Sequence, residues 1–171
     1  MTNKKIRWGI IGLGNIANKF ATDLATVENT ELIAVASRNM QNANEFAEKH
    51  HAKKAYSSYL ELAKDANVDA VYIATPHSFH KEHTILCLQH KKAVLCEKPF
   101  AMNLQEVTEM IQVAKENNTL LMEALWTFFL PHFTYLLELV KSEKFGKIQS
   151  LEADFGFHGP YNTDSRLFKK E

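Results

Sequence analysis

Cysteine is scarce in this 171-residue chain, and there is no excess of charge of either sign. Cys87 and Cys96 are too few and too close to frame a disulfide scaffold, which favours a reducing cytosol. The 20 Lys and Arg residues balance the 20 Asp and Glu residues, so the basic excess on which nucleic-acid binders depend is missing. We therefore expect a cytoplasmic protein with no nucleic-acid partner.

Long apolar runs are missing as well. None approaches the ~18 residues that would span a bilayer, so no membrane partner is expected. The basic start, residues 1–7, has neither the apolar core nor the small-residue cleavage site of a secretion signal. The content of 46% apolar and 23% charged residues is typical of globular proteins and excludes disorder and collagen-like repeats. At this length we expect roughly one domain and at most the start of a second.

The sequence does have a regular alternation of short apolar runs and helical periodicity. The apolar runs are typical of buried parallel strands, and they are Ile6–Ile11, Leu32–Ala36, Ala70–Ala74, Ala93–Leu95 and Leu120–Glu123. The helical stretches are Ile16–Thr26, Met40–His50, Ser58–Lys64, Ser78–His90 and one starting at Asn103, which Glu106 completes as a capping box. This order predicts an α/β fold, a Rossmann-type doubly wound parallel sheet over residues 1–122.

The pattern changes over residues 123–171, where we expect the start of an incomplete α+β domain with an antiparallel sheet. Pro131 predicts the first turn of a helix. Its apolar positions predict a buried stripe of Phe133, Leu136, Leu137 and Val140. From Ile148 to Phe157 apolar and polar residues alternate, as in a half-exposed antiparallel strand. One strand makes no sheet, so we expect this second domain to be unfinished.

A Gly-x-Gly-x-x-Ala pattern, formed by Gly12, Gly14 and Ala17, follows the first predicted strand. The first glycine allows a tight turn, the second lets the backbone approach a pyrophosphate, and the alanine keeps the helix close to the sheet. The helix N-terminus, with Asn15 and Ile16, then faces the anion. The pattern predicts a dinucleotide site, and two turn glycines without a ligand are the alternative.

The end of the second predicted strand indicates which dinucleotide binds. An NAD site usually has Asp or Glu there, roughly 20 residues beyond the glycine pattern, to hold the ribose hydroxyls. This chain has Ser37, Arg38 and Asn39 instead, with no carboxylate. A hydroxyl and a guanidinium suit a 2′-phosphate. NADP is therefore the predicted cofactor, and NAD is the alternative.

Two more polar segments follow strands at the edge where open α/β sheets collect ligands. The residues expected to contact the cofactor there are Thr75, Pro76, His77 and His80 after the third strand, and Glu97 and Lys98 after the fourth. Pro99 biases Lys98 toward an extended backbone, from which its side chain can stand over the crevice. A partly desolvated lysine near a positively charged ring can have a lowered pKa and serve as acid or base. A solvated turn is the alternative for this segment.

Three of these motifs together resemble the glucose-fructose oxidoreductase, inositol dehydrogenase and rhizopine-catabolism (Gfo/Idh/MocA) family. They are the early Gly-x-Gly-x-x-Ala, the Thr-Pro-His-x-x-His of residues 75–80, and Glu97-Lys98-Pro99. Residues 122–127 are similar to the branch that contains dimeric dihydrodiol dehydrogenases and NADP-dependent D-xylose dehydrogenases. The resemblance implies a dinucleotide domain followed by a domain for substrate binding and dimerisation, and hence a homo-oligomer.

The same resemblance assigns roles to residues. It implies that Lys98 is the catalytic lysine, that His77 and His80 lie beside the nicotinamide, and that Trp126 and Phe155 line an apolar substrate pocket. Members of the family continue with an Asp-x-Gly-x-Tyr motif that supplies a second acid/base group. No counterpart is found here, since Tyr161 lies on the wrong side of residues 166–168, so we expect this chain alone to be catalytically incomplete.

The function we predict is an NAD(P)-dependent oxidoreductase that transfers a hydride between nicotinamide and a secondary alcohol of a sugar, polyol or cyclic diol. A non-catalytic dinucleotide-binding sensor or partner protein is the alternative. A metal-dependent hydrolase is the least favoured class. His77, His80 and His83 are three residues apart, but positions six apart on a helix diverge by ~120°, so no metal site is predicted.

Overall fold

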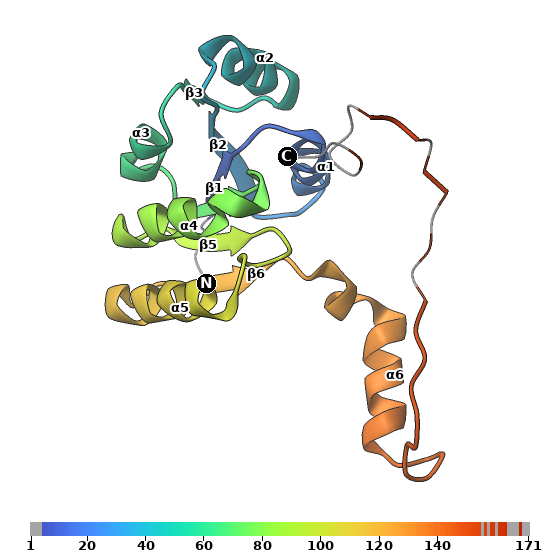
Figure 1. The fold of residues 1–171 in the computed structure, drawn as a ribbon. Coiled ribbons are helices and arrows are strands. Elements are labelled where there is room, and N and C mark those ends of the chain that lie inside the picture. Colours follow the sequence, from blue (N-terminus) through green and yellow to red (C-terminus); the bar gives the residue numbers. More distant parts are fainter. Residues whose placement is uncertain (1–4, 155, 157, 160, 164–167, 169–171) are drawn as a thin grey trace. The chain divides into compact units, whose positions relative to one another are not determined.

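The computed structural model describes residues 5–154, 156, 158–159, 161–163 and 168, and the chain divides into two compact units, Met1–Trp126 and Thr127–Glu171. The first unit contains a six-stranded sheet in the order β3-β2-β1-β4-β5-β6, with every adjacent pair parallel (Figure 1). The strands are β1 (Ile6–Ile11), β2 (Thr30–Ala36), β3 (Lys54–Tyr56), β4 (Ala70–Ile73), β5 (Ala93–Cys96) and β6 (Leu121–Glu123). The strand order reverses between β1 and β4, so the predicted Rossmann-type doubly wound sheet is confirmed.

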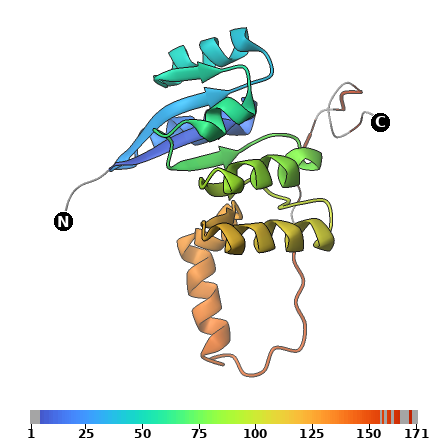
Figure 2. The ribbon, with the colours of Figure 1, turned by 90° about the vertical axis from the view of Figure 1, so that its left-hand side faces the viewer.

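Five helices of this unit cover the two faces of the sheet (Figure 2). They are α1 (Asn15–Leu24), α2 (Met40–His50), α3 (Tyr59–Lys64), α4 (His80–Gln89) and α5 (Leu104–Asn117). Ala17 of α1 and Phe46 of α2 pack with Tyr72 in the core of one face. Leu62 of α3 and Leu88 of α4 pack in the core of the other face, together with Ala114 of α5. Both faces of the sheet are therefore buried.

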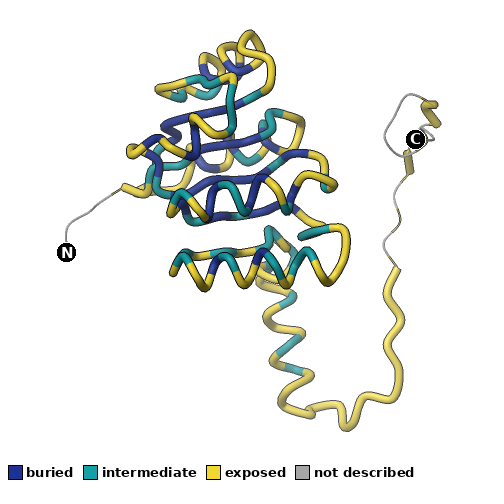
Figure 3. Tube along the Cα trace, turned by 60° about the vertical axis from the view of Figure 1, so that its left-hand side comes forward, coloured by how far each residue is buried: buried dark blue, intermediate teal, exposed yellow. Residues whose placement is uncertain are grey.

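Burial explains why the strands are apolar along their whole length. All four residues of β4 are buried, and Ile10, Ile11 and Val35 have no exposed surface. Figure 3 shows the buried residues following the strands. Each fully buried side chain of this size contributes about 1.5–3 kcal/mol of transfer free energy. Central strands covered on both faces show no alternation of apolar and polar residues, and such continuous runs are what the sequence has.

Side-chain caps mark where helices begin. Asn39 caps α2, where its Oδ1 accepts the N–H of Gln41 at 2.8 Å. Asn103 caps α5, where its Oδ1 accepts the N–H of Glu106 at 3.0 Å, so the predicted start is confirmed. The returning half of the capping box differs from the prediction, because the Glu106 carboxylate accepts the N–H of Met102 at 3.1 Å instead of that of Asn103.

The second unit contains α6 (Pro131–Lys141), which starts at the proline as predicted and follows the 3₁₀ helix η2 (Trp126–Phe129). Its predicted buried stripe is wrong, because no residue of α6 is buried. Phe133 and Leu137 are half-buried, but Leu136 is 50% and Val140 42% exposed. A stripe is buried only against a second layer, and beyond η2 the described residues of this unit form no other helix or strand.

The expected antiparallel strand is not formed at residues 148–154 either, and no antiparallel sheet occurs among the described residues. Phe155 and Phe157, the end of that prediction, lie outside the described residues. A strand needs a neighbour that takes up its backbone N–H and C=O groups. Alternation of side chains alone does not supply that neighbour.

Cys87 and Cys96 are free and buried. Burial raises the pKa of each thiol to about 12, so neither is a reactive thiolate near neutral pH. Among the helices formed by described residues, none has the length and apolar character needed to cross a membrane.

Candidate functional site

Gly12 makes the turn from β1 into α1 at the centre of the sheet. Its φ is +85°, in the region that side chains disfavour. A Cβ on it would lie 2.7 Å from the backbone nitrogen of Thr75 and 2.8 Å from the carbonyl atoms of Ala74. Its N–H donates to the carbonyl of Ala36 at 3.3 Å, which ties the turn to the end of β2. Because the obstructing atoms are backbone, only glycine fits here.

Gly14 is glycine for a different reason. It is the N-cap residue of α1, and no side chain caps this helix. A Cβ on Gly14 would meet nothing within 4 Å, so nothing in the described chain demands the missing side chain. Asn15 and Ile16 are exposed, whereas Ala17 is fully buried against the sheet. The first N–H groups of α1 thus face open space with a positive helix end behind them, which suits a phosphate approaching the backbone closely.

Ser37 and Arg38 follow β2 at the carboxyl edge of the sheet. The Ser37 N–H donates to the carbonyl of Tyr56 at 3.1 Å, and its Oγ accepts the N–H of Asn39 at 3.3 Å. Arg38 is exposed and lines a cavity of about 270 Å³. The other lining residues are Tyr59, Thr75, Pro76, Phe79, Glu82 and His83. The cavity therefore joins the ends of β2 and β4 to helices α3 and α4.

His83 forms a buried wall of this cavity. Its Nδ1 lies 3.0 Å from the Thr75 hydroxyl, and the rings of Tyr59 and Phe79 pack against it with centroids 4.6 and 5.7 Å away. Burial lowers the pKa of His83; Glu82 opposes this shift, and His80 and Arg38 add to it. A neutral imidazole leaves the guanidinium of Arg38 as the cation of the cavity. The sequence motifs do not indicate Tyr59, Phe79 or Glu82, because Phe79 occupies an unspecified position of the 75–80 motif and Tyr59 and Glu82 lie outside every motif.

The predicted residues Thr75 and Pro76 lie in the loop after β4, His77 lies in the helical turn that follows, and His80 is the first residue of α4. Thr75 is buried, Pro76 is exposed and His77, in the 3₁₀ helix η1 (His77–Phe79), is half-buried. His80 is 1% exposed, and its ring nitrogens lie 2.9 Å from the carbonyl of Thr75 and 2.8 Å from that of Pro99. His80 therefore connects the loops after β4 and β5. Its contact with the cofactor, like that of His77, stays a prediction.

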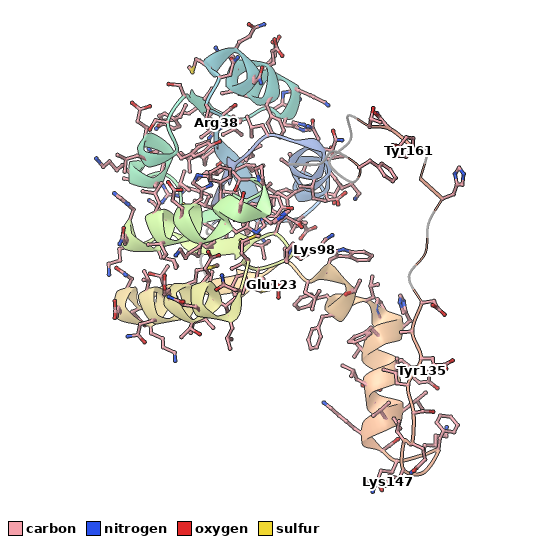
Figure 4. All side chains as sticks on the ribbon, in the orientation of Figure 1. Arg38, Lys98, Glu123, Tyr135, Lys147 and Tyr161 are labelled. Atoms are coloured by element: carbon pink, nitrogen blue, oxygen red, sulfur yellow. The ribbon has the colours of Figure 1, made fainter. Side chains whose placement is uncertain are left out.

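Lys98 follows β5 at the same edge of the sheet as Arg38 (Figure 4). Its backbone N–H donates to Oε2 of Glu97 at 3.1 Å, and His80 holds the next carbonyl, that of Pro99. The Lys98 side chain is exposed, and within the described part of the chain its ammonium group has no hydrogen bond or ion pair. The main chain is thus fixed while the amine remains available to a ligand.

The predicted substrate pocket, lined by Trp126 and Phe155, stays a prediction. Trp126 is 56% exposed in η2, and Phe155 lies outside the described residues. His77, His80 and His83 do not gather into a metal site. Among the described residues no group of three or more His, Cys, Asp or Glu side chains could hold an ion.

Residues 6–125 match the model of the Gfo/Idh/MocA oxidoreductase family with an NAD-binding Rossmann fold. The chain belongs to this family. Two relatives in it are the trans-1,2-dihydrobenzene-1,2-diol dehydrogenases of Mus musculus, at 46% identity, and Homo sapiens, at 44%. Each alignment covers 93% of this chain and 49% of the relative. The chain thus spans about half the length of these relatives.

Solved Gfo/Idh/MocA-type structures show the same fold. A 3-ketoreductase variant from Actinomadura kijaniata, in complex with TDP-benzene and NADP, has a TM-score of 0.79 and 29% identity over 85% of this chain and 46% of its own. Scyllo-inositol dehydrogenase from Lactobacillus casei, with NAD(H) and scyllo-inositol, has a TM-score of 0.77 and 26% identity over 84% of this chain and 43% of its own. NADP and NAD are therefore both found on this fold.

Proposed function

We propose that this protein is an NADP-dependent oxidoreductase that transfers a hydride between nicotinamide and a secondary alcohol of a sugar, polyol or cyclic diol. The observation that carries the proposal is the turn of residues 12–16, where backbone atoms leave no room for a side chain at Gly12, while the space in front of Gly14 is open. The oxidoreductase family of the chain supports the reaction class. The cyclic diol and the inositol named for its relatives, and the 3-ketoreductase activity named for another, support the substrate class.

The residues at the carboxyl edge of the sheet suit a dinucleotide. The backbone N–H groups at Gly14, Asn15 and Ile16 would hold the pyrophosphate. Arg38 and Ser37 would hold the adenosine half, and the residues after β4 and β5 would hold the nicotinamide half. Nicotinamide supplies the hydride acceptor or donor. The chain supplies binding, orientation and a proton carrier.

Lys98 is the proton carrier we propose. Its main chain is fixed on both sides, by Glu97 and His80, and its amine is available at the edge where the nicotinamide half would lie. In the oxidation of an alcohol, Lys98 would take the hydroxyl proton, and in the reverse direction it would return that proton. Trp126 and Phe155 remain the proposed apolar wall for the substrate.

Arg38 is the reason for proposing NADP over NAD. It lines the cavity at the end of β2, and residues 37–39 hold no carboxylate that would repel a 2′-phosphate. Glu82 of α4 also lines this cavity. Its carboxylate could accept hydrogen bonds from the ribose hydroxyls of NAD, and NAD is therefore the alternative cofactor.

Calorimetric titration tests the cofactor, and absorbance of the reduced nicotinamide with a panel of polyols, sugars and cyclic diols tests the reaction. We expect NADPH to bind more tightly than NADH, and at least one secondary alcohol to be oxidised by the protein that carries this chain. Absence of binding by both cofactors would overturn the proposal.

A non-catalytic dinucleotide-binding sensor is the second candidate. The observation that favours it is the amine of Lys98, which has no hydrogen bond or ion pair to another acid/base group within the described residues. This candidate predicts tight NADPH binding with turnover at background for every alcohol tested.

Homo-oligomer formation is part of the proposal. Three large side chains of α6 are exposed, Tyr135 at 60%, Leu136 at 50% and Val140 at 42%. Apolar surface of this kind is commonly covered by a partner subunit. We expect light scattering of the purified protein to give at least twice the mass of one chain. A monomer mass at every concentration tested would contradict homo-oligomer formation.

A further inference from the structure

Glu97 is a buried carboxylate that directly follows β5, on the strand end proposed above for the nicotinamide half. It is 9% exposed, and both of its oxygens accept hydrogen bonds. Oε1 accepts the hydroxyl of Tyr72 at 2.5 Å, and Oε2 accepts the backbone N–H of Lys98 at 3.1 Å. The Glu97 N–H donates to the carbonyl of Ile73 at 3.0 Å. Main chain and side chain of Glu97 are therefore both held in place.

Tyr72 is itself rigidly packed. It lies in β4, is 2% exposed, and stacks on Phe20 of α1 with ring centroids 3.9 Å apart and planes 16° from parallel. Trp8 packs edge-on against Phe20, with ring centroids 5.4 Å apart. Burial and the hydrogen bond to Glu97 raise the pKa of Tyr72, so its hydroxyl stays protonated and keeps donating. The tyrosine fixes where the carboxylate points.

Glu97 forms no ion pair within the described part of the chain, not even with the ammonium group of neighbouring Lys98. Its two donors, a phenol and a backbone amide, are both neutral, and no salt bridge to Glu97 occurs among the described residues. A buried carboxylate without a cation loses hydration that neutral donors only partly replace. Such a group is stabilised when a positive charge binds next to it.

The nicotinamide dinucleotide proposed for the carboxyl edge of the sheet carries a positive charge on its ring in one redox state only. The dinucleotide of a doubly wound fold lies across the carboxyl ends of the strands, with one half over each half of the sheet. Glu97 follows β5, in the half opposite Arg38. An oxidised nicotinamide ring is positively charged, and a reduced ring is neutral. A fixed carboxylate in a water-poor site distinguishes the two.

We propose that Glu97, held by Tyr72, makes this site favour the oxidised over the reduced nicotinamide cofactor. The inference rests on the proposed dinucleotide function. It assigns to Glu97 a specificity for redox state, and it assigns to Tyr72 the positioning of that charge. Glu123, at the end of β6, is only half-buried and lines a separate groove against α5, so its charge is better screened by water.

The test is a measurement of binding to NADP⁺ and NADPH for the wild type, Glu97→Gln and Tyr72→Phe. Glu97→Gln should weaken NADP⁺ binding ~10-fold and change NADPH binding less than twofold, since a charge at this range acts on the cation alone. Tyr72→Phe keeps the stacked ring and removes only the hydroxyl, so the carboxylate loses its fixed position. We expect this variant to weaken NADP⁺ binding by about threefold, with NADPH again little changed.

Tyr56 and Asp65 provide a matched control. The Tyr56 hydroxyl donates to Asp65 at 3.0 Å. Tyr56 ends β3, in the half of the sheet opposite β5, and Asp65 follows α3, where its backbone carbonyl accepts Nζ of Lys92. Tyr56→Phe and Asp65→Asn remove the same kind of bond and charge away from the proposed nicotinamide half. Both should leave the ratio of the two dissociation constants within twofold of the wild type.

The outcomes separate the two proposals. A wild type that binds neither cofactor overturns the proposed function and this inference with it. A wild type that binds both, with a ratio unchanged by Glu97→Gln, overturns this inference alone. Should Glu97→Gln fail to fold, the conservative Tyr72→Phe decides: a preference for NADP⁺ reduced about threefold supports the assignment, and an unchanged ratio overturns it.

Discussion

Gly12 and Thr75 are so close that a Cβ on the glycine would lie 2.7 Å from the threonine's backbone nitrogen. This contact joins the turn after β1 to the loop after β4, at the point where the strand order reverses. Gly12→Ala combines a steric clash with a left-handed φ, so we expect it to destabilise the protein by roughly 2–3 kcal/mol. Urea denaturation measures the loss, and an unchanged midpoint would show that the turn can shift.

Gly14→Ala should separate folding from binding. A Cβ there meets nothing within 4 Å, so stability should fall by at most about 1 kcal/mol, the cost of alanine at an N-cap. If a pyrophosphate occupies the space in front of α1, the methyl group obstructs it, and NADPH affinity should drop at least ~10-fold. Calorimetry measures the NADPH affinity of the folded variant. An affinity equal to that of the wild type would show that a bound pyrophosphate is not the reason for glycine at position 14.

Arg38→Ala tests the cofactor preference. A charge-assisted contact to a 2′-phosphate is worth on the order of 1.5–3 kcal/mol, or roughly 10- to 150-fold in affinity. NADPH binding should weaken by that factor while NADH binding changes little. Glu82→Gln is the companion variant, because Glu82 lines the same cavity. If Glu82→Gln weakens NADH binding and Arg38→Ala leaves NADPH binding unchanged, the site is of the NAD type.

Lys98→Ala should affect turnover and spare binding. Positioned proton transfer contributes on the order of 10²-fold or more, so kcat with the best alcohol substrate should fall at least ~100-fold. The dissociation constant of NADPH should stay within about twofold, since the glycine turn, not Lys98, holds the pyrophosphate. Equal turnover in wild type and variant would leave the lysine with a structural role only.

Asp65 should make the fold sensitive to acid. Burial raises the pKa of Asp65, but hydrogen bonds from Lys54, Asn67 and Tyr56 outweigh burial and hold the pKa at about 2, below its ordinary 3.8. Because the folded-state pKa is the lower one, the carboxylate stabilises the fold above pH ~4, and this contribution is lost as the pH falls toward 2.

The contribution of Asp65 is on the order of 1–2 kcal/mol, since half-exposed Lys54 is screened by water. Urea unfolding at a series of pH values would show a decline over this range in the wild type. Asp65→Asn should be less stable at pH 7 and should show a shallower decline. Parallel curves for the two proteins would mean that other carboxylates cause the acid sensitivity.

The order of helices and strands in the first unit was predictable because its signals are local. The predictions Ile6–Ile11 and Met40–His50 agree with the structure residue for residue. Caps such as Asn103 act within one turn of their own helix. The strand β3 was missed, since three residues at the sheet edge form no apolar run. Motif spacing also placed Gly12, Arg38 and Lys98 at one edge, because parallel strands bring their carboxyl ends together.

Only the tertiary structure decided which side chains meet. Tyr72 and Glu97 are 25 residues apart and face each other because β4 and β5 pair in one register. The cavity of Arg38 receives Phe79 and His83 from another loop and helix, which no local pattern indicates. In residues 127–163 the apolar stripe of α6 is present in the sequence, yet Leu136 and Val140 stay exposed. Periodicity determines which residues share a face, whereas burial depends on a partner surface that the pattern does not specify.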